Sequence, residues 1–297
     1  MEIRKYLGFI FILTGITLVP VFVNAYDAET THPALTKETV ELFNYYHSDL
    51  KFSDKERDLL MLGSTKEDDP VTRCVNHFYD PIYNDGLTVG ISLGLDAKDW
   101  SQNTKNQMGA LNVAGVGLTK DLFSANSDYS WERAIYDYAH NDKERALESL
   151  GHILHLIQDM SVPPHTRNDD HISGRDDSPY ETYTSSFNKD NIKDISSSLE
   201  NEEEIILSDI GKYFNSLASF TNNNFFSKDT VDNEIRFRQY AEPVVDFEKE
   251  EYIEGLENIL FGYKNLEGDN FKLVGIKRAF IKNKKKSLLL FLSGILI

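Results

Sequence analysis

The sequence predicts an all-α fold with a single multi-helix domain. Apolar residues recur at helical spacing along most of the chain, and the two-residue alternation typical of half-buried strands is scarce. The 297 residues are 40% hydrophobic, which suffices for one large core, and no linker or internal repeat divides them. We therefore expect stability to come from helix packing around one core.

Helical periodicity begins near the amino end. The first predicted helix covers residues 36–46, where Val40, Phe43 and Tyr46 are spaced by three, and Thr36 is a candidate cap. A second helix over residues 54–62 is expected to end at Gly63. Further helices are predicted over residues 104–123, 131–139, 143–160, 180–187, 192–220, 231–240 and 245–263.

The first 25 residues have the pattern of a secretory signal peptide. Two basic residues precede an apolar stretch over residues 7–23, and Val23-Asn24-Ala25 is a small-residue cleavage site. The pattern predicts a secreted or extracytoplasmic protein whose mature chain begins at Tyr26. Because the apolar stretch is long, an uncleaved membrane anchor is the alternative.

The carboxyl-terminal segment, residues 266–297, is basic and then apolar. Six lysine and arginine residues between 277 and 286 precede an almost wholly apolar run over residues 287–297. That run is too short to span a bilayer as a helix. It is interpreted as a weak membrane-surface contact or as a truncated segment. The helical domain is expected to cover residues 26–265.

Charge and cysteine content limit the function classes. The formal net charge of −17 is spread along the chain, which is typical of a solvated surface and weighs against tight binding to nucleic acid or to anionic membranes. It does not exclude cleavage of short strands at a metal site. Cys74 is the single cysteine, so an intrachain disulfide cannot form.

Residues 155–165 hold three potential metal ligands. His155 and Asp159 are four apart and so share a helix face, while the prolines that follow are expected to end the helix and carry His165 beyond it. Imidazole and carboxylate suit zinc, and a carboxylate can bridge two ions. Taken alone, the His155–Asp159 pair could be an ordinary surface hydrogen bond. His152 is expected to pack or to support a ligand.

Other ligand-rich places lie nearer the amino end. Asp68 belongs to an acidic run in which Glu67 and Asp69 are competing choices, since such runs are usually solvated loops. His77 opens a His-Phe-Tyr-Asp-Pro sequence, and His32 lies just inside the expected mature chain. If these places converge on the motif at residues 155–165, the fold surrounds a di- or trinuclear zinc site.

These motifs together resemble zinc-dependent phospholipase C and its relatives, the fungal single-strand nucleases. The family helix motif His-x3-Asp-x5-His is matched at residues 155–165, and the His-Phe-Tyr-Asp-Pro of bacterial phospholipases is matched at residues 77–81. Residues 177–181 resemble the family element His-x-x-x-Glu, with Asp177 in place of the histidine. The resemblance covers roughly residues 26–265 and is specific through the combination of motifs.

The resemblance implies two to three zinc ions and assigns ligands to each. One ion would be bound by Asp68, His77, His155 and Asp159, and Asp68 would also act as the catalytic base. A neighbouring ion would be bound by the amino nitrogen and carbonyl of Tyr26, by His32 and by the other oxygen of Asp159. A third would be bound by His165 and Glu181, with either Asp177 or His171 completing it.

The activity implied is hydrolysis of a phosphodiester by a metal-activated water, with a phospholipid head-group ester as the favoured substrate. A single-strand nuclease or other phosphoesterase of the same fold is an alternative, although neither a stacking pocket nor a basic lining is evident. A non-catalytic surface protein that uses zinc as a structural staple is another. Structural zinc sites close their coordination shell, whereas catalytic sites keep a position open.

Overall fold

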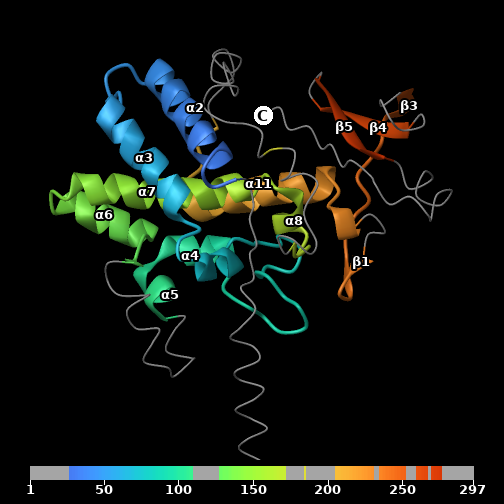
Figure 1. Cartoon of the computed structure of the whole chain (residues 1–297), viewed down its shortest axis with the longest axis horizontal. Helices are drawn as coiled ribbons and strands as arrows, with labels where there is room; N and C mark the ends of the chain where they lie inside the picture. Colours follow the sequence, from blue (N-terminus) through green and yellow to red (C-terminus); the bar gives the residue numbers. More distant parts are fainter. Residues whose placement is uncertain are drawn as a thin grey trace, which may run out of the picture.

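Helices predominate in the computed structural model, which describes residues 27–109, 127–171, 184, 205–230, 234–251, 259–266 and 269–275. α7 runs through the middle of the helical body, with α2 and α3 on one side and α6 on the other (Figure 1). The mostly helical fold expected from the sequence is confirmed. The helices are α2 (Thr31–Tyr46), α3 (Asp54–Lys66), α4 (Ala97–Gln102), α5 (Thr104–Gly109), α6 (Trp131–Ala139), α7 (Lys143–Asp159), α8 (Pro163–Thr166) and α11 (Ile210–Asn224), with 3-10 turns η1 (Val71–Asn76) and η3 (Lys228–Thr230).

The carboxyl-terminal part contains strands where helices were predicted. β1 (Glu234–Ile235) and β2 (Arg238–Gln239) form a hairpin. The strands β3 (Phe247–Glu251), β4 (Ile259–Leu266) and β5 (Asp269–Gly275) form an antiparallel sheet in that order. The predicted helices over residues 231–240 and 245–263 are therefore wrong, although helices predominate in the described part of the chain.

Cross-strand packing explains this outcome. Phe247 pairs with Tyr263 in the register of β3 and β4, and their rings stack with centroids 5.0 Å apart. Short apolar runs are compatible with both the helical and the strand periodicity of the sequence. Aromatic pairs between neighbouring strands then favour the sheet. The sheet also crosses the expected domain boundary at residue 265, because β5 beyond it pairs with β4.

The helix containing His32 begins earlier than predicted. α2 starts at Thr31, so Thr36 is buried inside the helix and does not cap it. Upstream, the Asp27 carboxylate accepts hydrogen bonds from the Thr30 backbone at 2.8 Å and from the Thr30 hydroxyl at 2.9 Å. This turn places His32 in the first turn of α2, with its side chain fully buried.

α3 and α7 cross with their backbones in contact. A Cβ atom on Gly63 would lie 2.0 Å from the carbonyl oxygen of Glu148, and one on Gly151 would lie 2.2 Å from that of Leu60. Only glycine permits this approach at the two positions. The crossing brings the end of α3 and the residues after it against the face of α7 that carries the histidine motif.

Apolar packing holds the helices around this crossing. One buried cluster joins α4, α7 and α11, and a second joins α2, α3 and α7. Their largest members include Trp100, Phe214 and Leu60, each of which is almost wholly buried. Among the helices described, none has both the length and the apolar character needed to cross a membrane.

Candidate metal centre

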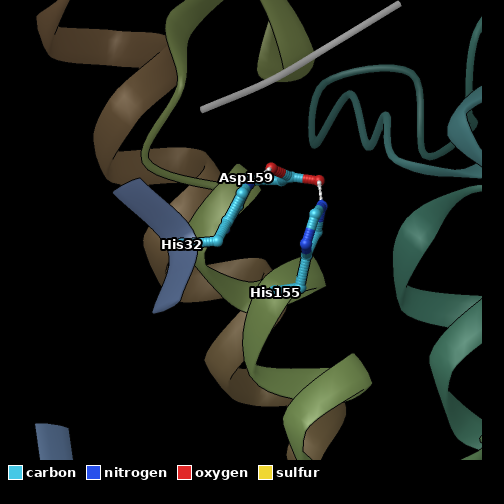
Figure 2. Close-up of side chains that lie close together, drawn as sticks. All are labelled: His32, His155 and Asp159. Atoms are coloured by element: carbon cyan, nitrogen blue, oxygen red, sulfur yellow. Dashed lines mark ion pairs between the residues drawn. The ribbon is translucent and has the colours of Figure 1, made fainter. Parts of the chain in front are cut away.

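Five of the predicted ligands converge on the last turn of α7. α7 contributes His155 and Asp159, α2 contributes His32, and His77 and Asp68 follow η1 and α3 respectively. Two groups have ligand atoms within 4.8 Å of one another: His32, His155 and Asp159 in one, and Asp68, His77 and His155 in the other. Figure 2 shows the first group. The expected convergence is thus found for all five residues.

Asp159 lies between the two groups. Its Oδ1 atom is 3.4 Å from Nε2 of His32, while its Oδ2 atom is 3.1 Å from Nδ1 of His77 and 3.6 Å from Nε2 of His155. The carboxylate is fully buried. Because each oxygen faces a different set of histidines, Asp159 has the geometry of a carboxylate that bridges two cations.

Hydrogen bonds fix two of the imidazoles in one tautomer. Nδ1 of His155 donates to the backbone carbonyl of Ser64 at 2.6 Å. Nδ1 of His32 donates to Oε1 of Gln158 at 2.7 Å, and the Gln158 amide in turn donates to the Thr36 hydroxyl at 3.0 Å. Both rings therefore direct the Nε2 lone pair toward Asp159, as is usual for metal-binding histidines. The rings also stack, with centroids 3.5 Å apart.

His165 lies beyond the end of α7, as expected, in a second short helix. α7 ends at Asp159, and the two prolines occupy the first positions of α8, where a missing N–H group costs nothing. Nδ1 of His165 donates to the His77 carbonyl at 2.9 Å, and Nδ1 of His171 donates to the Asp169 carbonyl at 3.0 Å. The two rings are 5.2 Å apart. The structure thus brings these two imidazoles near each other, and the third ion stays a prediction.

Three predicted ligands fall outside the described residues. These are Tyr26, Asp177 and Glu181. The amino-terminal ligand of the second ion, the choice between His171 and Asp177, and the carboxylate of the third ion therefore stay predictions. The predicted signal peptide over residues 1–25 and the apolar run over residues 287–297 also lie outside this part of the chain.

The histidines of the centre differ in their electrostatics. Despite burial, the Asp159 and Glu67 carboxylates raise the pKa of His77 well above its usual range. Burial lowers the pKa of His155 well below its usual range, and it lowers the pKa of His165 to about 3. Both rings are therefore deprotonated at neutral pH, which is the form that binds a metal. Burial also raises the pKa of Asp68 to about 6, against the opposing effect of nearby His77. Asp68 is the most accessible of the five, with 15% of its side chain exposed.

The donor atoms fit a bound dication. Both carboxylate oxygens of Asp68 and of Asp159, Nδ1 of His77, and Nε2 of His155 are buried without a hydrogen-bond partner in the described part of the chain. Unpaired buried polar atoms are costly, and coordination of a cation would satisfy them. Mixed imidazole and carboxylate donors suit zinc among the common metals.

Glu67 is a functional candidate that the sequence did not single out. It is wholly buried and accepts hydrogen bonds from Nη2 of Arg73 at 2.6 Å, Nε1 of Trp100 at 3.0 Å and Nδ1 of His152 at 2.5 Å. His152 thus contacts the residue that precedes Asp68 and is not itself one of the converging ligands. In the sequence, Glu67 was one of three adjacent acidic residues. Only the position of Arg73 and Trp100 in the fold distinguishes it.

Comparison with known proteins does not identify the class of this protein, so the class is inferred from the centre. No family model, no curated protein and no solved structure matches the chain. The donor set and its geometry define a candidate binuclear metal centre in a mostly helical fold.

Proposed function

We propose that the protein is a secreted zinc-dependent phosphodiesterase that hydrolyses a phospholipid head-group ester. The observation that carries the proposal is the position of Asp159, whose two oxygens face two ligand groups that share His155. Such an arrangement would hold two cations side by side. Paired metal ions suit phosphodiester hydrolysis because they stabilise the attacking and leaving oxygens together.

The chain's own residues have distinct tasks in this proposal. His32, His77, His155 and Asp159 would hold the ions, and the bound zinc would polarise the phosphoryl oxygens and acidify a water. Asp68 is suited to accept that water's proton. Its side chain is 15% exposed although both carboxylate oxygens are buried, and its pKa of about 6, raised by burial, leaves it ionised yet weakly basic at neutral pH.

The surface near the centre favours a lipid over a nucleic acid. The loop over residues 80–95 is fastened beside His165, because the Thr88 backbone donates to Oδ1 of Asn168 at 2.7 Å and accepts from its Nδ2 at 2.9 Å. On this loop Ile82 is 53% exposed and Ile91 is 69% exposed. The sequence from residue 74 to residue 97 contains no lysine or arginine. Lys98 and Arg238, the cations that contact this loop, are bound to Asn84 and Asp80. A rim with exposed apolar side chains and cations already paired suits a zwitterionic lipid surface better than a phosphate backbone.

A third exposed apolar side chain lies near this loop. Phe237 is 96% exposed at the turn of the β1–β2 hairpin, with a left-handed φ of 68°. Arg238 and Tyr240, which follow the turn, bind Asp80 at 2.8 and 2.6 Å and so join the hairpin to the loop. In Figure 1 the hairpin and the loop before α4 project toward the same edge.

The test measures metal content and hydrolysis together. Protein beginning at residue 26 would be loaded with zinc and assayed on phosphatidylcholine vesicles, on a soluble aryl phosphodiester and on single-stranded DNA, with and without chelator. We expect two or three zinc ions per chain and chelator-sensitive cleavage of the lipid. His155→Ala should abolish it, whereas His140→Ala, at an exposed position ending α6, should not.

Each other outcome has a defined meaning. Salt-sensitive cleavage of DNA with intact lipid would make the protein a nuclease of the same chemistry. Full zinc occupancy with no turnover on any substrate would support a structural staple and refute the enzyme. Folded protein that binds no zinc would refute the metal centre.

A further inference from the structure

Glu67 is surrounded by hydrogen-bond donors. Arg73 and Trp100 can only donate through the atoms that face it, and His152 donates through Nδ1. Nε2 of His77 lies 3.7 Å from Oε1 of the same carboxylate. These donors require a side chain that accepts hydrogen bonds at two oxygens, and a carboxylate is such a side chain.

His77 is oriented differently from the other histidines of the centre. Its Nδ1 atom is 3.1 Å from Oδ2 of Asp159 and 3.5 Å from Oδ1 of Asp68, so this nitrogen faces the proposed cation. In His32 and His155 it is Nδ1 that donates to an oxygen acceptor and Nε2 that faces Asp159. The ring of His77 is thus reversed with respect to theirs.

We propose that Glu67 is a positioning residue that holds His77 with Nε2 protonated, so that His77 binds the metal through Nδ1. The proposal rests on the metal-binding part of the proposed function. It assigns to Glu67 no contact with metal or substrate. A neutral imidazole binds a metal only through its unprotonated nitrogen. The group that accepts the hydrogen bond from Nε2–H therefore determines that Nδ1 is the nitrogen available to the metal.

The surroundings of Glu67 explain how it can set this orientation. Arg73 belongs to η1, which leads directly into His77, so the bond from Arg73 to Glu67 ties the backbone before His77 to the end of α3. The guanidinium also lies 5.0 Å from the centre of the Trp100 ring. Since Arg73, Trp100 and Glu67 are all buried, the carboxylate has a fixed position from which to orient the imidazole.

The first test reads the imidazole nitrogens directly. The zinc-loaded chain beginning at residue 26 would be labelled with 15N-histidine, and long-range proton–nitrogen correlations would be recorded. The pattern lost in His77→Asn identifies His77. We expect zinc on Nδ1 and a proton on Nε2 for His77, with the reverse for His32 and His155. Zinc on Nε2 of His77, or a His77 pattern that does not change with zinc, would overturn the proposal.

The second test removes the acceptor. Glu67→Gln replaces one carboxylate oxygen by a donor amide, and we expect zinc affinity to fall about 10- to 100-fold, as for other groups that support metal ligands. Asp137→Asn is the matched control. Asp137 is also a buried carboxylate paired with arginines, at 2.9 Å from Arg133 and 3.6 Å from Arg145, but it lies on α6 and contacts none of the proposed ligands.

The outcomes separate positioning from simple destabilisation. Loss of zinc affinity and a changed His77 pattern in Glu67→Gln alone would support the proposal, and equal zinc affinity in both variants would overturn it. If Glu67→Gln does not fold, the nitrogen pattern of the wild-type protein still shows whether zinc binds His77 through Nδ1. Zinc binding through Nδ1 of His77 without any phosphodiester hydrolysis would keep this inference and refute the proposed function.

Discussion

The bridging position of Asp159 predicts how zinc should stabilise the fold. A ligand that binds only the folded state adds about 2.7 kcal/mol when its free concentration is 100 times Kd. The structure contains two ligand groups, so saturating zinc should add about 5 kcal/mol at that concentration. For a domain of this size that corresponds to an increase in Tm of about 10–20 °C.

Replacing Asp159 with asparagine should remove most of this gain. One oxygen of Asp159 faces each group, so the substitution weakens both, whereas His32→Ala removes a ligand from one group only. We therefore expect the zinc-dependent increase in Tm to nearly vanish in Asp159→Asn and to fall by about half in His32→Ala.

Thermal unfolding followed by circular dichroism would measure this. Each variant would be compared with itself in chelator and in buffered free zinc, so that the effect of the substitution on the metal-free fold cancels. An Asp159→Asn protein that keeps the full zinc-dependent increase would refute the bridging geometry. A wild-type protein with no increase would refute the centre itself.

Three further variants test the fold and the proposed lipid surface. Glu56→Ala removes the capping box of α3 and should cost about 1 kcal/mol in urea unfolding at pH 7. Hydrogen bonds from Lys143 and Ser53 lower the pKa of Glu56 from 4.5 to about 2. The contribution of this carboxylate to the free energy of unfolding is therefore present above pH 4.5 and is lost as pH falls toward 2. If Glu56→Ala destabilised the protein equally at pH 2 and pH 7, this reasoning would be contradicted. Gly63→Ala forces the crossing helices apart and should cost at least about 1–3 kcal/mol, with weaker zinc binding measured alongside. The double substitution of Ile91 and Phe237 by glutamate should reduce hydrolysis of vesicles and sedimentation with them, and unchanged vesicle hydrolysis would exclude these side chains from lipid contact.

The helices around the centre could be predicted from the sequence because their signals are local. The predicted helix over residues 131–139 coincides with α6, and the one over residues 143–160 ends one residue beyond α7. The motif on α7 was predictable for the same reason. His155 and Asp159 are one helical turn apart, so forming the helix is enough to place them together.

The remaining features depend on contacts between distant segments. The sheet of β3, β4 and β5 is decided by pairing between strands, as in Phe247 with Tyr263, and not by any single period in the sequence. The role of Glu67 depends on Trp100, which is 33 residues away and reaches it only through the fold. The two prolines before His165 were expected only to end a helix, although proline also fits the first turn of the next one.

α3 and α7 are in contact at Gly63 and Gly151. The number of residues between each glycine and the ligands that follow it therefore determines whether those ligands meet. Ser64, Glu67 and Asp68 follow Gly63 at fixed short intervals, and His152, His155 and Asp159 follow Gly151 in the same way. One residue inserted after either glycine would turn every later side chain of that helix by about 100° and point it away from the centre. Related chains should therefore tolerate changes of residue type between these positions but no change of length. The paired patterns Gly-Ser-x-x-Glu-Asp and Gly-His-x-x-His-x-x-x-Asp are a signature by which distant members of such a family can be sought.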